Sequence, residues 1–385
     1  MGKMELKDSV KPGMTSNLFI SRSSFASNLR WVRSNLNPSV KICATLKGDA
    51  YGHGIYELSK VACKNEIDYI GISSNEEAEA VFFINPKTSL IRLRPAFPYE
   101  TECLIRKNIF VEEQAGSWVS AVNLNKIGEK FQTKIKVHLN LDSGMGRSGF
   151  YYKKPDIKDK ILKIPSFPFL EIVGIMTHFP NADAENVDST VKSLNDFIDF
   201  VSFLKQQNTQ YRNSIVHCAS SASFLRIPET HLDMIRPGAV LYGNRTSEYV
   251  PMSDDIKQVM TWKTKIVHVS EVDADTPIGY GTLYKTNQPT KIATIPIGLC
   301  DGYPRSLTNK GYVLIRGIKC PVVGRVSLSL TTVEVPQEIQ INDEVILIGS
   351  QGQLTIKAED LAATFSSVHT EIQMAGFHNK RIYVD

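Results

Sequence analysis

The chain has 385 residues, of which 42% are hydrophobic, and 44 basic residues nearly balance 40 acidic ones, for a net charge of +4. This composition excludes disordered and collagen-like classes, and the small charge argues against nucleic acid or an acidic membrane surface as a partner. No apolar run reaches the roughly 18 residues of a membrane span. The six cysteines show neither a metal-binding nor a disulfide spacing. We expect a protein without a bound metal, located in the cytoplasm, or in the periplasm if a signal peptide has been removed.

Short β-branched runs alternate with helical patterns over the first two thirds of the chain. The predicted strands span 41–46, 68–73, 89–93, 109–113, 134–142, 171–178, 214–219 and 234–243. The clearest predicted helix runs from Ser189 to Gln206, where apolar residues recur at steps of three and four. Another helix is predicted to begin with Asn75 as its N-cap. Eight strands separated by helices favour a parallel (β/α)₈ TIM barrel, with an open doubly wound sheet as the alternative.

The pattern changes after about residue 252. Strand-like runs at 259–272, 291–298, 311–317, 321–335 and 343–349 are separated by Gly, Pro, Asn and Asp, and no long helical pattern precedes about Lys357. The sequence therefore predicts an α/β protein with an N-terminal barrel at 18–252 and a C-terminal, mostly β domain at 253–385. Residues 1–17 could join the second domain.

Several chemically capable residues follow the C-terminal ends of the predicted barrel strands, where such barrels place their active sites. They are Lys47, Arg147, His178, Ser220, Ser221 and Arg236. A partly desolvated lysine flanked by cations has a lowered pKa and attacks aldehydes. Serine hydroxyls and glycine-bearing loops bind phosphate. The set as a whole suits pyridoxal phosphate, an aldehyde that carries a phosphate. The alternative is that Lys47 only solvates a strand end.

The segment LKGDAYGHG, residues 46–54, closely resembles the cofactor-lysine motif of the alanine racemase family. Six further segments resemble motifs of that family, in the family's order: LDSGMGRSGF, IMTHF, IRPGAVLYG, IGYGTLY, PIGLCDGYPR and PVVGRVSLS. Three others, ISSNEEAEA, LIRLRPA and IPETHLDMIRPG, are more similar to the broad-specificity amino-acid racemases. The family fold is a (β/α)₈ barrel followed by a β domain, in agreement with the pattern above.

This resemblance implies a pyridoxal-phosphate-dependent racemase that interconverts L- and D-alanine. A racemase needs two bases on opposite faces of its substrate, because each enantiomer releases its proton on its own side. Lys47 would hold the cofactor and act as one base. Tyr280 would be the other base and reach in from the partner subunit of a homodimer. The implied cofactor-binding residues are Lys47, Tyr51, Arg147, His178, Ser221, Arg236, Gly238 and Ala239, and the implied substrate contacts are Arg147 and Leu328.

The same resemblance assigns further roles around the cofactor. Arg236 would face its pyridine nitrogen, and His217 would support Arg236. A cation there disfavours a proton on the ring nitrogen, so the ring withdraws electrons less strongly. His178 would lie beside the ring near Tyr280, and Arg147 would approach the phenolic oxygen. Tyr280 needs a neighbouring cation or histidine, because an unperturbed phenol has a pKa of about 10.

The chain departs from the family pattern at several positions. Asn140 stands where many members have a lysine that becomes carbamylated, and an anion such as chloride could fill the space instead. Ser220 replaces an asparagine, and Ser329 replaces an aspartate next to the substrate contact. Leu299 and Thr370 replace tyrosines at the substrate entrance. A wider entrance favours larger amino acids over alanine.

Three other functions stay open beside the alanine racemase. The first is a racemase of larger, for example basic, amino acids. The second is a decarboxylase of the same cofactor fold type, although such enzymes usually place an acid rather than an arginine at the pyridine nitrogen. The third is a non-catalytic cofactor-binding protein, although single-barrel carriers lack the second domain that this sequence predicts.

Overall fold

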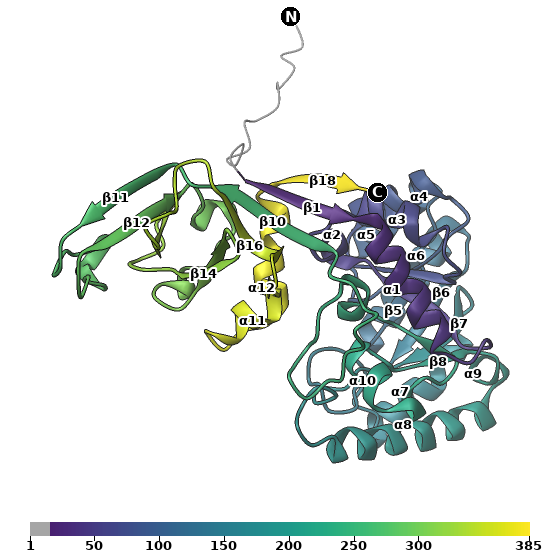
Figure 1. Cartoon of the computed structure of the whole chain (residues 1–385). Helices are drawn as coiled ribbons and strands as arrows, with labels where there is room; N and C mark the ends of the chain where they lie inside the picture. The colour runs from purple at the N-terminus through teal and green to yellow at the C-terminus, as the bar shows by residue number, and fades with distance from the viewer. Residues whose placement is uncertain (1–15) are drawn as a thin grey trace, which may run out of the picture.

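Residues 16–385 are described by a computed structural model, in which a barrel of strands and helices lies beside a mostly β domain (Figure 1). The prediction for residues 1–15 lies outside this range. The barrel strands are β2 (Lys41–Thr45), β3 (Tyr69–Ile72), β4 (Ser89–Arg92), β5 (Glu113–Ala115), β6 (Ile135–Asn140), β7 (Leu170–Met176), β8 (Ile215–His217) and β9 (Met234–Ile235).

Two parallel four-stranded sheets form the barrel wall. Their strand orders are β4-β3-β2-β9 and β5-β6-β7-β8. Single parallel bridges join the sheets at both seams, from Ile91 to Glu112 and from Ala219 to Ile235. Eight strands therefore close into one barrel, and the predicted fold class is confirmed.

The fourth predicted barrel strand, 109–113, is wrong in position. The backbone N–H of Ile109 donates to the carbonyl of Leu104, which keeps this segment in the turn that follows the preceding helix. Only Glu112 bonds to the neighbouring strand, where its N–H donates to the carbonyl of Leu90 at 2.8 Å. The strand β5 begins one residue later.

Two other predicted strands are too long. The run at 234–243 stops being a strand after Ile235, since Pro237 has no N–H to donate, and Ala239–Tyr242 form the 3₁₀-helix η3. The run at 321–335 is divided between β14 (Ile318–Pro321) and β15 (Thr331–Val335) by a loop.

Nine helices of the described chain accompany the barrel strands, in addition to a short turn, α2 (Lys47–Tyr51), at the site. They are α1 (Arg22–Ser34), α3 (Ile55–Ala62), α4 (Asn75–Ile84), α5 (Pro98–Arg106), α6 (Trp118–Phe131), α7 (Pro155–Lys163), α8 (Asp188–Gln207), α9 (Thr209–Arg212) and α10 (Ser221–Arg226). The predicted helix at 189–206 corresponds to α8. The predicted N-cap of α4 is wrong by one residue, because the hydroxyl of Ser74 accepts the N–H of Glu77.

The second domain is built mostly from antiparallel strands. Besides β14 and β15 they are β10 (Met260–Lys265), β11 (His268–Val272), β12 (Thr290–Ile295), β13 (Tyr312–Ile315), β16 (Glu344–Gln351), β17 (Leu354–Ile356) and β18 (Lys380–Val384). Two short helices, α11 (Ala358–Ala363) and α12 (His369–Gln373), lie between β17 and β18 in the chain. Strand β1 (Asn17–Ser21) pairs with β10 and, in parallel, with β18. The first described strand therefore belongs to the seven-stranded sheet of the second domain. The domain boundary at residue 252 stays a prediction.

One apolar core joins the two parts. It runs from Leu18 and Phe25 through Ile42 and Ile70 of the barrel to Ile346 on β16 of the second domain. The C-terminal strand β18 consequently lies beside β1 and close to the barrel (Figure 1). Within residues 16–385, no helix combines the length and the apolar composition required to cross a membrane.

Candidate active site

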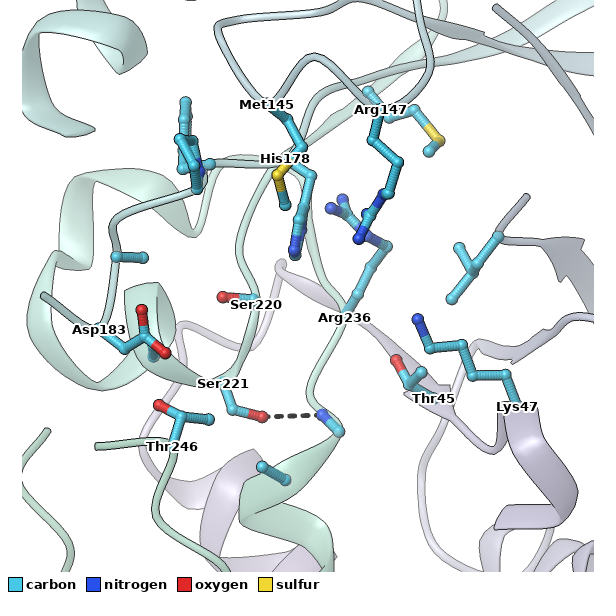
Figure 2. A pocket seen from close by; sticks show the side chains of 18 of the residues that line it. Thr45, Lys47, Met145, Arg147, His178, Asp183, Ser220, Ser221, Arg236 and Thr246 are labelled. Atoms are coloured by element: carbon cyan, nitrogen blue, oxygen red, sulfur yellow. Dashed lines mark hydrogen bonds between the residues drawn. The ribbon is translucent and has the colours of Figure 1, made fainter. Parts of the chain in front are cut away.

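A cavity of about 360 Å³ opens at the mouth of the barrel. The predicted residues Lys47, Tyr51, Arg147, His178, Ser220, Ser221, Arg236, Gly238 and Ala239 all line it. Figure 2 shows the side chains of Lys47, Arg147, His178 and Arg236 directed into the same space. The structure thus brings together residues that are far apart in the sequence, and their individual roles stay predictions.

Lys47 opens a turn with an unusual backbone. The φ angles of Gly48, Asp49, Ala50 and Tyr51 are 66°, 50°, 55° and 53°, so the turn is left-handed. Backbone bonds still close it, from the N–H of Ala50 to Leu46 and from that of Gly52 to Gly48. A left-handed turn costs about 1–2 kcal/mol for each residue that is not glycine. Such strain persists only where surrounding contacts impose it.

Two acidic side chains hold the turn in this conformation. The carboxylate of Glu77 accepts the backbone N–H of Asp49 at 2.9 Å and that of Ser73 at 2.6 Å. The carboxylate of Asp49 accepts the N–H of Ile55 at 2.7 Å and forms an ion pair with Arg381. Arg381 lies on β18, so the last strand of the chain clamps the turn that carries the lysine. Sequence reasoning missed Glu77 and Arg381, because neither belongs to the strand ends of the barrel.

The surroundings of Lys47 favour its neutral amine. Burial lowers the pKa of this lysine, and the charges of Arg147 and Arg236 lower it further, whereas Glu77 acts in the opposite direction. A neutral amine is both a nucleophile and a base. The cavity therefore lowers the pKa of Lys47, as a cofactor-binding lysine requires.

A small polar cradle lies at the other side of the cavity. The hydroxyl of Ser221 accepts the N–H of Gly238 at 2.8 Å (Figure 2). A Cβ atom on Gly238 would lie only 2.8 Å from the phenolic oxygen of Tyr51, so a larger residue would displace that hydroxyl from the cradle. Burial raises the pKa of Tyr51 to about 12, which keeps its phenol as a hydrogen-bond donor. Hydroxyl and backbone donors around a gap without a side chain fit a phosphate group.

Arg236 directly follows β9 and is fixed by acceptors at the ends of β7 and β8. It donates to the Nδ1 atom of His217 at 2.8 Å and to the carbonyls of Thr177 at 2.8 Å and Cys218 at 3.3 Å. Burial and the nearby Arg236 hold the pKa of His217 well below its usual value. His217 therefore accepts from Arg236 as a neutral ring, in the arrangement that the resemblance implies.

His178 is also neutral. Burial lowers its pKa to about 3, with further contributions from Arg236, Arg147 and Lys47. Asn140 also lines the cavity and donates to the hydroxyl of Ser148 at 3.3 Å. Its neutral amide cannot replace the charge of a carbamylated lysine. The lining also includes the buried side-chain oxygen of Gln114, which has no hydrogen-bond partner among residues 16–385. Sequence reasoning missed Gln114, which stands inside a strand without a motif.

Tyr280 and Leu328 do not line this cavity. Both lie in the second domain, with exposed fractions of 70% and 69%. Tyr280 begins the 3₁₀-helix η4 (Tyr280–Thr282), and a Cβ on Gly281 would lie 3.4 Å from a guanidinium nitrogen of Arg325. The guanidinium of Arg325 therefore lies close to the backbone of η4, and the role of Tyr280 as the second base stays a prediction. Within one chain, the structure does not bring Tyr280 to Lys47.

Fold and site together define a barrel protein with a second, mostly β part, in which a lysine of lowered pKa and a small polar cradle share the barrel mouth. The sequence matches the family described as alanine racemase, N-terminal domain, over residues 20–246. It matches the alanine racemase, C-terminal domain, over residues 259–383. The chain therefore belongs to the alanine racemase family, and the predicted family and the racemase class of enzyme are confirmed.

Individual relatives agree with this assignment. An alanine racemase of Halothermothrix orenii is 34% identical over 347 residues, which cover 90% of each chain. A broad specificity amino-acid racemase of Vibrio vulnificus is 34% identical over 376 residues, or 97% of this chain and 90% of that one. The crystal structure of alanine racemase from Bartonella henselae with covalently bound pyridoxal phosphate has a TM-score of 0.84 and 25% identity, and the match covers 96% of this chain and 99% of that one.

Proposed function

We propose that this chain is a pyridoxal-phosphate-dependent racemase that interconverts L- and D-alanine, with Lys47 and Tyr280 as its two bases. The observation that carries the proposal is the position of Lys47. Its amine has a lowered pKa and faces the same cavity as the Tyr51, Ser221 and Gly238 cradle. Bound pyridoxal phosphate supplies an electron-withdrawing ring that makes the Cα proton of an amino acid acidic.

The residues of the cavity divide the work around this cofactor. Lys47 holds it and moves a proton at the Cα atom on one face of the substrate. The cradle binds the phosphate through the hydroxyls of Tyr51 and Ser221 and the backbone of Gly238 and Ala239. The remaining groups orient the cofactor and the substrate. Arg236 would lie at the ring nitrogen of the cofactor and neutral His178 beside the ring. Arg147 would point toward the phenolic oxygen of the cofactor and the carboxylate of the substrate.

The second base comes from a partner subunit in this proposal. Tyr280 lies on the exposed surface of the second domain, and Leu283, Leu328 and Leu330 of the same domain are 47%, 69% and 45% exposed. In this proposal these apolar side chains belong to the subunit interface. A homodimer would cover them and would bring Tyr280 and the backbone of Leu328 to the mouth of the partner's barrel.

The entrance favours a second candidate, a racemase of larger amino acids. Thr370 lines the cavity at a position where the family pattern has a tyrosine, and the half-exposed Leu299 replaces another. Both changes remove an aromatic ring and leave more room for a long side chain. The relative from Vibrio vulnificus, a broad specificity enzyme, is as similar to this chain as the alanine racemase of Halothermothrix orenii.

A chiral product assay tests the proposal and separates its alternatives. The purified protein with added cofactor is incubated with each enantiomer of Ala, Ser, Lys, Arg and Met, beside the variants Lys47→Ala and Tyr280→Phe. We expect alanine to be inverted by the wild type and by neither variant. Faster inversion of lysine or arginine would favour the broad racemase, and carbon dioxide release would favour a decarboxylase. Bound cofactor without inversion of any substrate would refute the racemase.

A further inference from the structure

A chain of buried polar side chains passes through the barrel core behind Arg236. The ring of His217 on β8 contacts His138 on β6, with 2.8 Å between Nε2 and Nδ1. The Nε2 atom of His138 lies 2.7 Å from a carboxylate oxygen of Glu112. Both histidines are fully buried, and Glu112 is 9% exposed. A polar chain of this length is unusual inside a barrel, whose interior is normally filled by branched apolar residues.

Strand β7, which lies between β6 and β8, provides the space for this contact. A Cβ atom on Gly174 would lie 2.0 Å from the Nδ1 atom of His138. Any other residue at this position would push the His138 ring away from His217. The two rings meet edge to face, at an angle of 84°. The contact is therefore built by three adjacent strands.

The direction of every hydrogen bond in the chain follows from its two ends. A guanidinium only donates, so the Nδ1 atom of His217 must accept from Arg236. The proton of this neutral ring is then on Nε2, which donates to the Nδ1 atom of His138. His138 in turn carries its proton on Nε2 and donates it to the carboxylate of Glu112. Only this order satisfies all three contacts with neutral rings.

We propose that Glu112 and His138 are positioning residues for racemisation: with His217 they form a directed hydrogen-bond chain that fixes the orientation of Arg236 and offsets its charge. The inference rests on the proposed function, in which Arg236 faces the pyridine nitrogen. The guanidinium groups of Arg147 and Arg236 line the same cavity as the amine of Lys47. The carboxylate at the far end of the chain makes His217 a stronger acceptor and reduces the positive field of Arg236 toward the cavity, since linked hydrogen bonds polarise one another.

Protonation states test the chain independently of activity. Neutron diffraction from crystals of the holoenzyme shows hydrogen or deuterium atoms directly. We expect one on the Nε2 atom of His138, one on the Nε2 atom of His217 and none on either Nδ1. A proton on the Nδ1 atom of His217, or two protons on either ring, would overturn the proposal. This result is informative even if the protein racemises no amino acid, which would refute the proposed function alone.

Two adjacent acids provide a matched pair of variants. Glu112→Gln keeps an acceptor for His138 and removes only the charge. Glu113 is even more buried, at 1% exposed, but belongs to another network, in which it accepts from Arg92 at 2.9 Å and Thr101 at 3.1 Å. We expect Glu112→Gln to lower kcat for alanine about tenfold with an unchanged KM. Glu113→Gln should lower the melting temperature and leave kcat within about twofold of the wild type.

A rescue variant separates charge from folding. Glu112→Asp restores the carboxylate, so its kcat should recover to within about threefold of the wild type. Equal kcat values for Glu112→Gln and the wild type, or equal losses in Glu112→Gln and Glu113→Gln, would overturn the proposal. If Glu112→Gln does not fold, the Glu112→Asp variant and the neutron map decide, since a chain with the opposite proton order contradicts the proposal by itself.

Discussion

Removal of the guanidinium of Arg381 tests how the lysine turn is held. In Arg381→Ala, Asp49 loses its ion pair and keeps only the N–H of Ile55. The turn then keeps two side-chain contacts, from the N–H of Asp49 to Glu77 and from the N–H of Ile55 to Asp49. Because three residues other than glycine are left-handed there, the turn stores about 3–6 kcal/mol of strain that the lost contact no longer opposes.

The structure sets the size of the effect. A hydrogen bond to a charged group contributes about 1.5–3 kcal/mol. The side chains of Arg381 and Asp49 are 20% and 28% exposed, and solvent screening places this pair toward the lower part of that range. If the turn conformation that binds the cofactor is destabilised by roughly 2 kcal/mol, cofactor binding weakens about 30-fold.

The assay is a titration of the cofactor-free protein with pyridoxal phosphate, followed by the change in absorbance. A matched control is Arg316→Ala, which removes an ion pair to Asp343 within the second domain, on a surface that does not touch the lysine turn. It should change the affinity less than about twofold. Wild-type affinity in Arg381→Ala, or an equal loss in Arg316→Ala, would refute the account of the turn.

Three further predictions concern the cradle, the histidines and the anion. Gly238→Ala should weaken cofactor binding at least tenfold in the same titration with little change in melting temperature, because its Cβ would lie 2.8 Å from the oxygen of Tyr51. Burial lowers the pKa of His53 and His369 from 6.5 to about 4, so the unfolded chain binds more protons and the free energy of unfolding falls as the pH drops from 6.5 to 4. Urea titrations should show that His369→Asn makes this slope smaller by up to about 1.4 kcal/mol per pH unit, and an unchanged slope would contradict the assignment. Crystals grown with bromide should show an anomalous peak beside Asn140, and its absence would leave that pocket without the expected anion.

Most barrel strands and the residues at their ends could be predicted from the sequence. Parallel strands are buried on both faces, so they appear as short apolar runs, and the mouth follows from their order. The predicted strand at 234–243 is too long because Pro237 has no N–H to donate to the sheet, although the residues around it have a high strand propensity. The predicted strand at 109–113 is misplaced because its first apolar residues belong to the turn that ends the preceding helix.

The supports of the site could not be predicted in this way. The left-handed turn at Asp49, Ala50 and Tyr51 depends on Arg381, which is more than 300 residues away in the chain. The chain from Glu112 to Arg236 depends on four strands and on the space at Gly174. Contacts between distant segments leave no periodic pattern in a single sequence, so only the folded structure reveals them.

The central claim is a site shared between two subunits, with Lys47 from one and Tyr280 from the other. The most direct test is subunit complementation. Lys47→Ala and Tyr280→Phe subunits carrying different tags are co-expressed, and the mixed dimer is purified and assayed for inversion of alanine. Each parent homodimer should be inactive, whereas the mixed dimer contains one intact site and should have about half the activity of the wild type. A mixed dimer no more active than its parents would contradict the account.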